Sequence, residues 1–530
     1  MARRLVLAAA LVAALLPVAG AGGTNSQTPK RGGAFVIGAI GGGEPACLNV
    51  LLERCPATGV SESILHVVLD GAFEVGPDLT YRPRLARVDF TTTAPFTLTY
   101  HVRPEARWSD GVPVTARDFV FTQRALERYL PAFDPENLHL TLVRSVRATD
   151  GRTVRVVLRE KNASWRSLFK YVLPSHVLQG KDLSQVWMDG VDDPDTGRPI
   201  GTGPFLVQSW LRGSQIVLVR NPRYWGAHAA YLDRLVYRFF PADADREELF
   251  RTGAVDQLGG RVSFTGARVL WTPTLAWEQF SIRIGGGGHP ALRSKLVRRA
   301  LAYGIERIGI QRRLEEEIDP VRLVSQSVMF PPASPYLEPH WARYRRRPDL
   351  ARRLLEQAEC ERGTDGVYSC GGRRLTLRFV TTGGVGRREG TLRFVQQQLR
   401  EIGIEVVPVY VAVPIRDVLD RGDFDAALFF YLRDPLLAGL DQELGCGGGF
   451  NFTGYCQRLV TADLDQADRI LDADRRAAVL NRADAQLARD VPVIPLWYVT
   501  GRVSLRKTVH GYTIYPLPLP WRAEDWWLER

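Results

Sequence analysis

The side chain best placed to bind a charged ligand is the carboxylate of Asp434. It follows an apolar stretch, residues 424–431, whose length and residue types indicate a buried β-strand. Ligands of open α/β sheets bind beyond the carboxyl ends of the strands, and Asp434 falls at such an end. Pro435 comes next, and an Asp-Pro step also initiates turns, so a ligand role and a turn role both stay open.

Sequence patterns of the common hydrolases and nucleotide-binding proteins are absent from the chain. It contains no GxSxG, HExxH or Walker motif, and its eight histidines are dispersed without metal-ligand spacing. Gly201 and Gly203 are not followed by the residues of a phosphate-binding loop. We therefore expect no catalytic residue, metal or cofactor, and keep a secreted hydrolase as a rival class to the function that the family resemblance described below implies.

The elements that would position Asp434 form a βαβ pattern. Strand 375–380, helix 387–402 and strand 404–411 come in turn, Gly403 ends the helix, and strand 424–431 follows. Parallel strands joined by crossover helices bring their carboxyl ends to one edge of a sheet. This part of the chain is therefore predicted to be an α/β lobe that is open along its strand ends.

The six cysteines occur as three pairs of near neighbours in the sequence. Six cysteines allow fifteen connectivities, and neighbour pairing closes the smallest loops at the lowest entropic cost. A zinc site would need closer CxxC spacing or nearby histidines. We predict disulfides, formed in an oxidising compartment, between Cys47 and Cys55, Cys360 and Cys370, and Cys446 and Cys456.

The first 21 residues are typical of a secretory signal peptide. Arg3 and Arg4 precede the apolar run 5–16, Pro17 and a small-residue site that ends at Ala21. We expect cleavage after Ala21 and favour the general secretory route over twin-arginine export. Because the first cysteine is Cys47, a lipid anchor through this leader is not expected. The mature protein is predicted to work at the periplasmic or extracellular face of the envelope.

The basic charge of the chain does not indicate nucleic-acid binding. The 530 residues carry a net charge of +11, with 45% hydrophobic and 24% charged residues, as in ordinary globular proteins. The basic residues are scattered beside Glu and Asp, and the cluster 343–347 has no aromatic-interleaved binding motif around it. We expect no nucleic-acid partner. The length indicates two or three domains.

Several sequence blocks resemble, in collinear order, the extracytoplasmic solute-binding proteins of family 5, the peptide and nickel receptors of ABC importers. Residues 99–122 (TYHVRPEARWSDGVPVTARDFVFT) resemble the signature block of the family. Residues 201–226 carry its "G-T-G-P-(F/Y)…N-x-x-Y-W" string, and residues 490–498 resemble its "D-x-P-V-I-P-L" strand. In the first block Trp108 and Asp110 are interpreted as scaffold, not ligand contacts.

The resemblance implies a periplasmic-binding-protein-like α/β fold of two lobes with an inserted α+β domain. Lobe I is expected to comprise residues 31–70, 200–285 and 495–530, the small domain residues 71–199, and lobe II residues 286–494. Such lobes close on a solute by hinge bending. The implied function is capture of oligopeptides for ABC importer permease subunits, by a monomer. Chelated nickel and oligosaccharides remain alternative solutes.

The resemblance also names ligand-binding candidates. In peptide-binding relatives a carboxylate in the corresponding loop pairs with the α-ammonium of the peptide, and Asp434 occupies that place, with Asp441 in reserve. Trp277 lies at the crossover toward lobe II, where family members contact ligand, and Tyr431 and Trp497 are further aromatic candidates. Arg433 is a candidate for a ligand carboxylate. For the three aromatic residues, core packing is the alternative.

Overall fold

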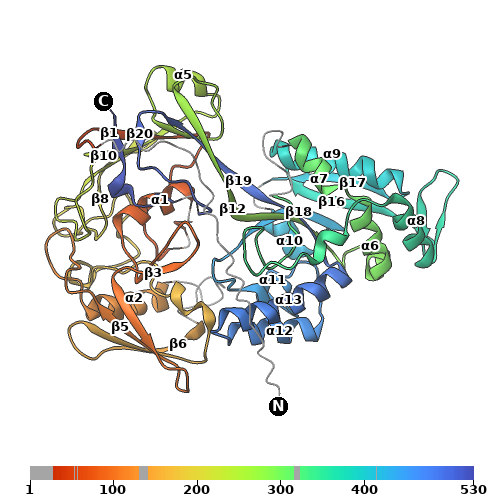
Figure 1. Ribbon diagram of the computed structural model, residues 1–530, viewed down its shortest axis with the longest axis horizontal. Coiled ribbons are helices and arrows are strands. Elements are labelled where there is room, and N and C mark those ends of the chain that lie inside the picture. The colour runs from red at the N-terminus through yellow and green to blue at the C-terminus, as the bar shows by residue number, and fades with distance from the viewer. Residues whose placement is uncertain are drawn as a thin grey trace, which may run out of the picture.

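The computed structural model describes residues 28–52, 54–55, 58–129, 141–314, 323–412, 415–517 and 519–529, so the predicted signal peptide lies outside the described residues. One mixed sheet runs through the molecule (Figure 1). Its ten strands, in spatial order, are β17 (Glu405–Val411), β16 (Thr376–Thr382), β18 (Ala426–Leu432), β12 (Ala267–Ile282), β19 (Val493–Arg506), β11 (Gln257–Gly259), β1 (Ala34–Ile40), β10 (Arg234–Phe240), β9 (Gln215–Arg220) and β8 (Phe205–Leu211).

The long antiparallel strands β12 and β19 belong to both halves of this sheet. Near Arg268, β12 pairs with the end of β19 beside β11, whereas near Phe280 it pairs with β18 and the start of β19. Figure 1 shows these two strands crossing from one lobe to the other. The register break within the strand pair places the crossing near residues 273–277 of β12 and 498–500 of β19. The lobe boundaries at residues 285 and 495 stay predictions.

The register of β12 against β19 breaks at this crossing. Pro273 pairs with Thr500 and Trp277 pairs with Tyr498, so residues 274–276 stand opposite Val499 alone. The bulge is held by the Thr274 hydroxyl, which donates to the Val499 carbonyl at 2.8 Å. Extra residues in one strand bend it locally. The crossing is therefore the point where the sheet can change direction.

Two large hydrophobic cores match the two halves. One core joins residues between 277 and 498, and the other joins residues between 35 and 237 with residues between 505 and 528. The chain thus enters lobe I, passes through lobe II and returns. The C-terminal segment packs Trp526 against Phe35 of the first strand, with ring centroids 5.3 Å apart.

Helices flank the sheet of lobe II, and a smaller sheet extends from lobe I. The helices of residues 286–494 are α6 (Lys295–Gly304), α7 (Arg307–Leu314), α8 (Pro348–Gln357), α9 (Gly386–Glu401), α10 (Arg416–Arg421), α11 (Leu440–Leu444), α12 (Arg458–Asp468) and α13 (Ala473–Asp490). On the other side lie α1 (Gly59–Val68), α2 (Ala116–Tyr129), α4 (Ser175–Leu178) and α5 (Arg246–Arg251). Short strands and 3-10 turns complete the description: β2 (Phe73–Val75), β3 (Tyr81–Pro83), β13 (Cys360–Arg362), β14 (Tyr368–Cys370), β15 (Arg373–Arg374), β20 (Val509–His510), β21 (Trp527–Leu528), η1 (Ala163–Ser167), η2 (Pro290–Arg293), η4 (His340–Arg343) and η5 (Ala523–Asp525).

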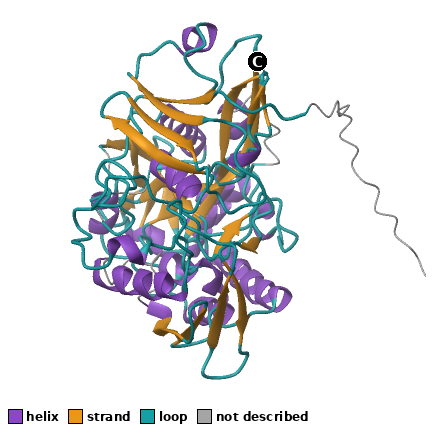
Figure 2. Ribbon diagram, turned by 90° about the vertical axis from the view of Figure 1, so that its left-hand side faces the viewer, coloured by secondary structure: helices purple, strands orange, loops and turns teal. Residues whose placement is uncertain are grey.

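The small domain is built on the block 99–122. Strands β4 (Ala86–Phe90), β5 (Thr97–Val102), β7 (Thr153–Leu158) and β6 (Val143–Ala148) form its sheet, which projects at the bottom of the molecule in both views (Figure 2). Asp118 starts α2 by accepting from the Thr115 amide at 2.7 Å. It also accepts from the amide and hydroxyl of Ser175, at 2.9 and 2.6 Å. Trp108 is fully buried, as a scaffold residue should be.

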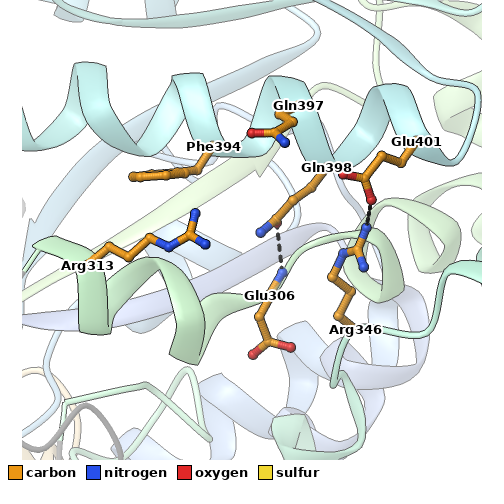
Figure 3. A pocket seen from close by; sticks show the side chains of 7 residues that line it. All are labelled: Glu306, Arg313, Arg346, Phe394, Gln397, Gln398 and Glu401. Atoms are coloured by element: carbon orange, nitrogen blue, oxygen red, sulfur yellow. Dashed lines mark hydrogen bonds and ion pairs between the residues drawn. The ribbon is translucent and has the colours of Figure 1, made fainter.

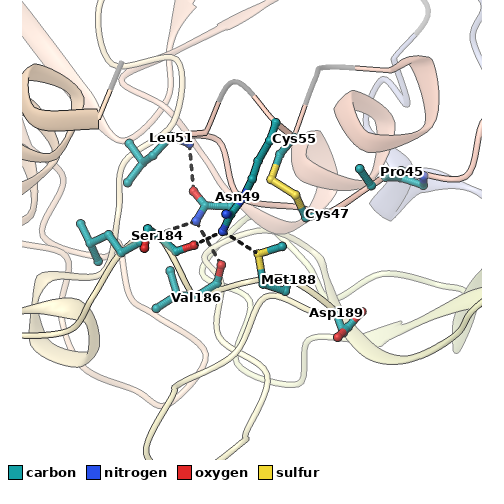
Figure 4. Close-up of a disulfide and its surroundings, with 12 residues drawn as sticks. Pro45, Cys47, Asn49, Leu51, Cys55, Ser184, Val186, Met188 and Asp189 are labelled. Atoms are coloured by element: carbon teal, nitrogen blue, oxygen red, sulfur yellow. Dashed lines mark hydrogen bonds between the residues drawn. A yellow bond between two sulfur atoms is a disulfide. The ribbon is translucent and has the colours of Figure 1, made fainter. Parts of the chain in front are cut away.

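The disulfides join the three neighbour pairs expected from the sequence. Cys360 and Cys370 stand directly opposite each other in the β13–β14 hairpin. The loop closed by Cys47 and Cys55 is fixed to residues 183–186 through Asn49, whose amide donates to the carbonyls of Leu183 and Val186 at 2.7 and 3.0 Å (Figure 4). All three disulfides therefore brace local loops.

We expect Asp118→Ala to lower the free energy of unfolding by about 2–3 kcal/mol, because it leaves the buried donors of Thr115 and Ser175 unpaired. Asp89→Ala removes an exposed carboxylate from the same domain and should change it by less than about 0.5 kcal/mol. Urea denaturation followed by circular dichroism measures both. Equal midpoints for the two variants would contradict the cross-linking role of Asp118.

Candidate functional site

Asp434 lies two residues beyond the end of β18. Its Oδ1 accepts the Leu436 amide at 2.7 Å and, more weakly, the Ala438 amide at 3.5 Å. The carboxylate thus shapes its own turn, as one of the two sequence interpretations proposed. Its Oδ2 makes no hydrogen bond to any residue within the described ranges. One oxygen therefore builds the loop and the other is available to a ligand.

The charge of Asp434 is poorly compensated by the protein. Burial raises its pKa, and the opposing effects of the loop amides, Arg476 and Lys170 do not cancel that rise. The Asp434 charge adds to burial in raising the pKa of Tyr81. Tyr81 and Lys170 belong to the small-domain side of the molecule and Asp434 to lobe II. The carboxylate therefore lies where the two sides face each other.

Arg476 of α13 supports the Asp434 loop from within lobe II. Its guanidinium donates to the Leu436 carbonyl at 2.5 Å and contacts Asp468 at 3.4 Å. Burial raises the pKa of Asp468 to about 6. Sequence reasoning missed this support, because α13 is remote from the loop in the chain and no local pattern links the two.

Arg433 is occupied by the protein itself. Its side chain is 2% exposed, and Nη1 lies 2.5 Å from the Glu443 carboxylate. Nη2 donates to the Val328 carbonyl at 2.8 Å, and the guanidinium lies over the Trp277 ring, 4.7 Å from its centroid. The reserve candidate Asp441 lies in α11 and accepts from the Gln442 amide at 2.7 Å. A ligand role for Arg433 or Asp441 stays a prediction.

The three aromatic candidates differ in their exposure. Trp277 and Trp497 are fully buried, whereas Tyr431 is partly buried and donates its hydroxyl to the Phe450 carbonyl at 2.6 Å. Trp277 and Tyr431 lie side by side on paired strands, with ring centroids 6.3 Å apart. Tyr431 is therefore the aromatic candidate nearest to solvent, and the two tryptophans pack in the core.

Two exposed apolar side chains that the sequence interpretation did not single out precede Asp434 at the end of β18. Phe430 is 49% exposed and Leu432 is 55% exposed. Strand β16 pairs with β18 only as far as Leu428, so the end of β18 extends past its neighbour and exposes alternate side chains. The end of β18 therefore presents apolar surface close in sequence to a carboxylate. Such a surface suits a ligand that carries both a positive charge and apolar groups.

A buried ion cluster links the crossing strands to lobe II. Glu278 of β12 is fully buried and accepts from Arg387 and Arg388, at the start of α9, at 2.9 Å each. Its other oxygen accepts the indole N–H of Trp497 at 3.1 Å. The cluster joins β12 and β19 to α9. Trp497 therefore helps to hold the start of β19 against lobe II.

A recess lies elsewhere on lobe II, among α7, α9 and the loop that carries Arg346 (Figure 3). It holds about 350 Å³ and is lined by Glu306, Arg313, Arg346, Phe394, Gln397, Gln398 and Glu401. Its charged residues include the ion pair of Arg346 with Glu401. None of the sequence-derived candidates lines it. Over the described ranges, no group of three His, Cys, Asp or Glu side chains forms a metal site.

The fold and the site define the class of the molecule. Two cores share a pair of crossing strands, and an under-compensated carboxylate lies between the sides, as in binding proteins that hold a solute between lobes. The model of the family described as bacterial extracellular solute-binding proteins, family 5 Middle, matches residues 80–437. The chain belongs to this family. None of the helices described in the structure is long and apolar enough to cross a membrane.

Known relatives are similar over nearly the whole chain. The oligopeptide-binding protein OppA of Mycobacterium tuberculosis is 27% identical, over 85% of this chain and 78% of its own length. The structure of AppA from Bacillus subtilis with a nonapeptide aligns at 20% identity with a TM-score of 0.73, covering 95% of this chain and 100% of AppA. The periplasmic EDTA-binding protein EppA aligns at 20% identity with a TM-score of 0.82, covering 96% and 98%.

We expect Arg433→Ala to destabilise the protein by about 3 kcal/mol, because it leaves the Glu443 carboxylate buried without its cation. Arg482→Ala breaks an ion pair whose arginine is 57% exposed and should cost less than about 1 kcal/mol. Thermal unfolding of the purified variants measures both. Equal melting temperatures for Arg433→Ala and the wild type would contradict the structural role of the Arg433–Glu443 pair.

Proposed function

We propose that the protein is the exported receptor of an ABC importer and captures oligopeptides between its lobes. The observation that carries this proposal is the position of Asp434, a partly buried carboxylate with one unpaired oxygen that faces the small-domain side. A peptide α-ammonium supplies the missing positive charge and three N–H donors. Charge-assisted hydrogen bonds of this kind are strong where water is excluded.

The surroundings of Asp434 favour a peptide over a polyanionic chelate. A carboxylate whose charge is already under-compensated repels further negative charge, whereas Phe430 and Leu432 offer apolar contact to side chains. The peptide names of OppA and AppA agree with this reading better than the EDTA name of EppA. Asp434 is therefore assigned to the ligand's amino end, and Tyr431 is the aromatic residue best exposed to contact it.

Closure is proposed to occur at the crossing of β12 and β19. The bulge residue Leu275 accepts the Arg433 amide of lobe II at 2.9 Å, and its own amide donates to Pro516 at 3.3 Å. One residue is thus bonded to the Asp434 loop and to the C-terminal segment of lobe I. A bend at 274–276 moves the two sides as bodies, because each has its own core. The closed monomer is what the permease subunits would recognise.

The site of action is proposed from the sequence and the disulfides together. The leader 1–21 directs export and is removed. Three disulfides then form outside the cytoplasm. The family is extracellular by description, which supports this location, whereas the cleavage site and the absence of a lipid anchor rest on the sequence alone. No catalytic step belongs to the proposed function.

Asp434→Asn should weaken binding of an unmodified pentapeptide about 10- to 100-fold, because the amide replaces the charged acceptor. Acetylation of the peptide should weaken binding to the wild type by a similar factor and have little further effect on the variant. Isothermal titration calorimetry measures all four combinations. Asp441→Asn tests the reserve candidate and should leave the peptide affinity unchanged if Asp434 holds the ammonium. Equal affinity of wild type and Asp434→Asn would overturn the assignment, and native mass spectrometry of the purified protein would then identify the solute.

Peptide affinity should fall on acidification at a pH above the ordinary aspartate range, because burial raises the pKa of Asp434. Protonation removes the charge that holds the ammonium, so affinity is full above the raised pKa and is lost below it. Calorimetry at a series of pH values checks this. In the Asp434→Asn variant the acid limb of the affinity profile should be absent, and its persistence would assign the titration to another group.

A further inference from the structure

A second carboxylate without a cationic partner among the described residues, Glu74, lies on the small-domain side of the molecule. Glu74 is the middle residue of β2 and stands opposite Arg82 of β3. Its side chain is partly buried, and burial raises its pKa. It makes no hydrogen bond or ion pair with the residues covered by the structure. Nothing in the mechanism proposed above uses it.

The arginines around Glu74 are engaged with other carboxylates. Arg84 pairs with Asp70 at 2.8 Å, Arg522 with Asp525 at 2.8 Å, and Arg82 with Asp78 at 2.9 Å. Once these pairs are formed, Glu74 and its neighbour Glu524 have no cation within ion-pair distance among the described residues. Glu524 receives only a long hydrogen bond, 3.4 Å, from the Tyr224 hydroxyl. The cluster therefore has an excess of negative charge.

The hydroxyl of Tyr515 points to a missing ligand group in this cluster. Tyr515 is 2% exposed, and its hydroxyl has no hydrogen-bond partner. Tyr515 packs against Trp521, with ring centroids 5.9 Å apart, and the Trp521 ring lies 5.6 Å from the guanidinium of Arg82, the residue directly opposite Glu74. The charge of Glu74 adds to burial in raising the pKa of Tyr515. Buried hydroxyls are rarely left unpaired. An N–H donor between the two groups would be accepted by both.

The cluster is adjacent to the region that Asp434 faces. In the β2–β3 hairpin Glu74 pairs with Arg82, whereas Tyr81, whose pKa is raised in part by the Asp434 charge, pairs with Val75 and projects from the opposite face. The Tyr171 hydroxyl, which interacts electrostatically with Tyr515, donates to Glu62 at 3.1 Å. Glu62 in turn pairs at 2.6 Å with Lys170, the cation that acts on Asp434. A ligand anchored at Asp434 would reach Glu74 along Lys170, Glu62 and Tyr171, and not across the face that carries Tyr81.

We propose that Glu74, with Glu524 and the Tyr515 hydroxyl, forms a second cation-binding subsite that selects peptides carrying a lysine or arginine side chain. This inference rests on the proposed function, because the peptide must be anchored at Asp434 for its side chain to reach the cluster. A basic side chain supplies both the positive charge and the N–H donors that the cluster lacks. Neutral peptides bind without using it.

The test is a set of pentapeptides in which one alanine at a time is replaced by lysine or by norleucine, its neutral counterpart of similar length. At one position, lysine should bind the wild type about tenfold more tightly than norleucine. Glu74→Gln should reduce this ratio to near one and leave the all-alanine peptide unchanged. Tyr515→Phe should reduce the ratio in part. Glu105→Gln, an exposed carboxylate of the same domain, should keep the full ratio.

The outcomes separate the two proposals. If all-alanine peptides bind but lysine never exceeds norleucine, the subsite is refuted while the peptide receptor stands. The same conclusion follows if Glu74→Gln weakens the lysine and alanine peptides equally. If no peptide binds, the receptor proposal fails and the subsite fails with it. Circular dichroism of each variant confirms that a lost ratio reflects recognition and not unfolding.

Discussion

The structure depends on one antiparallel strand pair that belongs to two bodies at once. Strands β12 and β19 supply hydrogen bonds to β11 at one end and to β18 at the other. Neither half can form its sheet without them, so the lobes cannot be independent domains on a loose linker. The register break opposite Val499 is where this shared pair departs from regular geometry. The closure proposed above places the bend there, at a bulge whose residue Leu275 is hydrogen-bonded to both sides.

The charged side chains removed from solvent fall into two kinds, those paired within the protein and those without a partner of opposite charge. Glu278 with Arg387 and Arg388, and Arg433 with Glu443, are buried ions that found partners within the chain, and they hold strands to helices and loops. Asp434 and Glu74 are partly buried carboxylates that have no cationic partner within ion-pair distance among the described residues. Since an unpaired charge is costly in the interior, a fold that keeps one has a reason outside its own stability. The two unpaired groups come from opposite sides, which suits a site that both lobes complete.

The sequence predicted the elements well where pattern and local chemistry agree. The βαβ unit around α9, the strand before Asp434 and the pairing of neighbouring cysteines follow from periodicity, turn residues and loop closure. It could not predict which candidate side chains point into the core. Trp277, Trp497 and Arg433 have the residue types of ligand contacts, and only the packing of β12, β19 and α11 shows that each is enclosed. Glu74 and Tyr515 were missed because 440 residues separate them in the chain and neither lies in a recognisable pattern.

The disulfides carry a consequence for how the protein can be produced. Each closes a loop of 8 or 10 residues within one side of the molecule, and none joins one side to the other. The disulfides thus stiffen local loops within each lobe and place no covalent restraint on the motion of one lobe relative to the other. Material made in a reducing host cytoplasm would keep its bending strands but lose the Cys446–Cys456 ring that encloses Phe450, the residue to which Tyr431 is bonded. Refolding yield and ligand recognition are for this reason separate measures of quality in such a preparation.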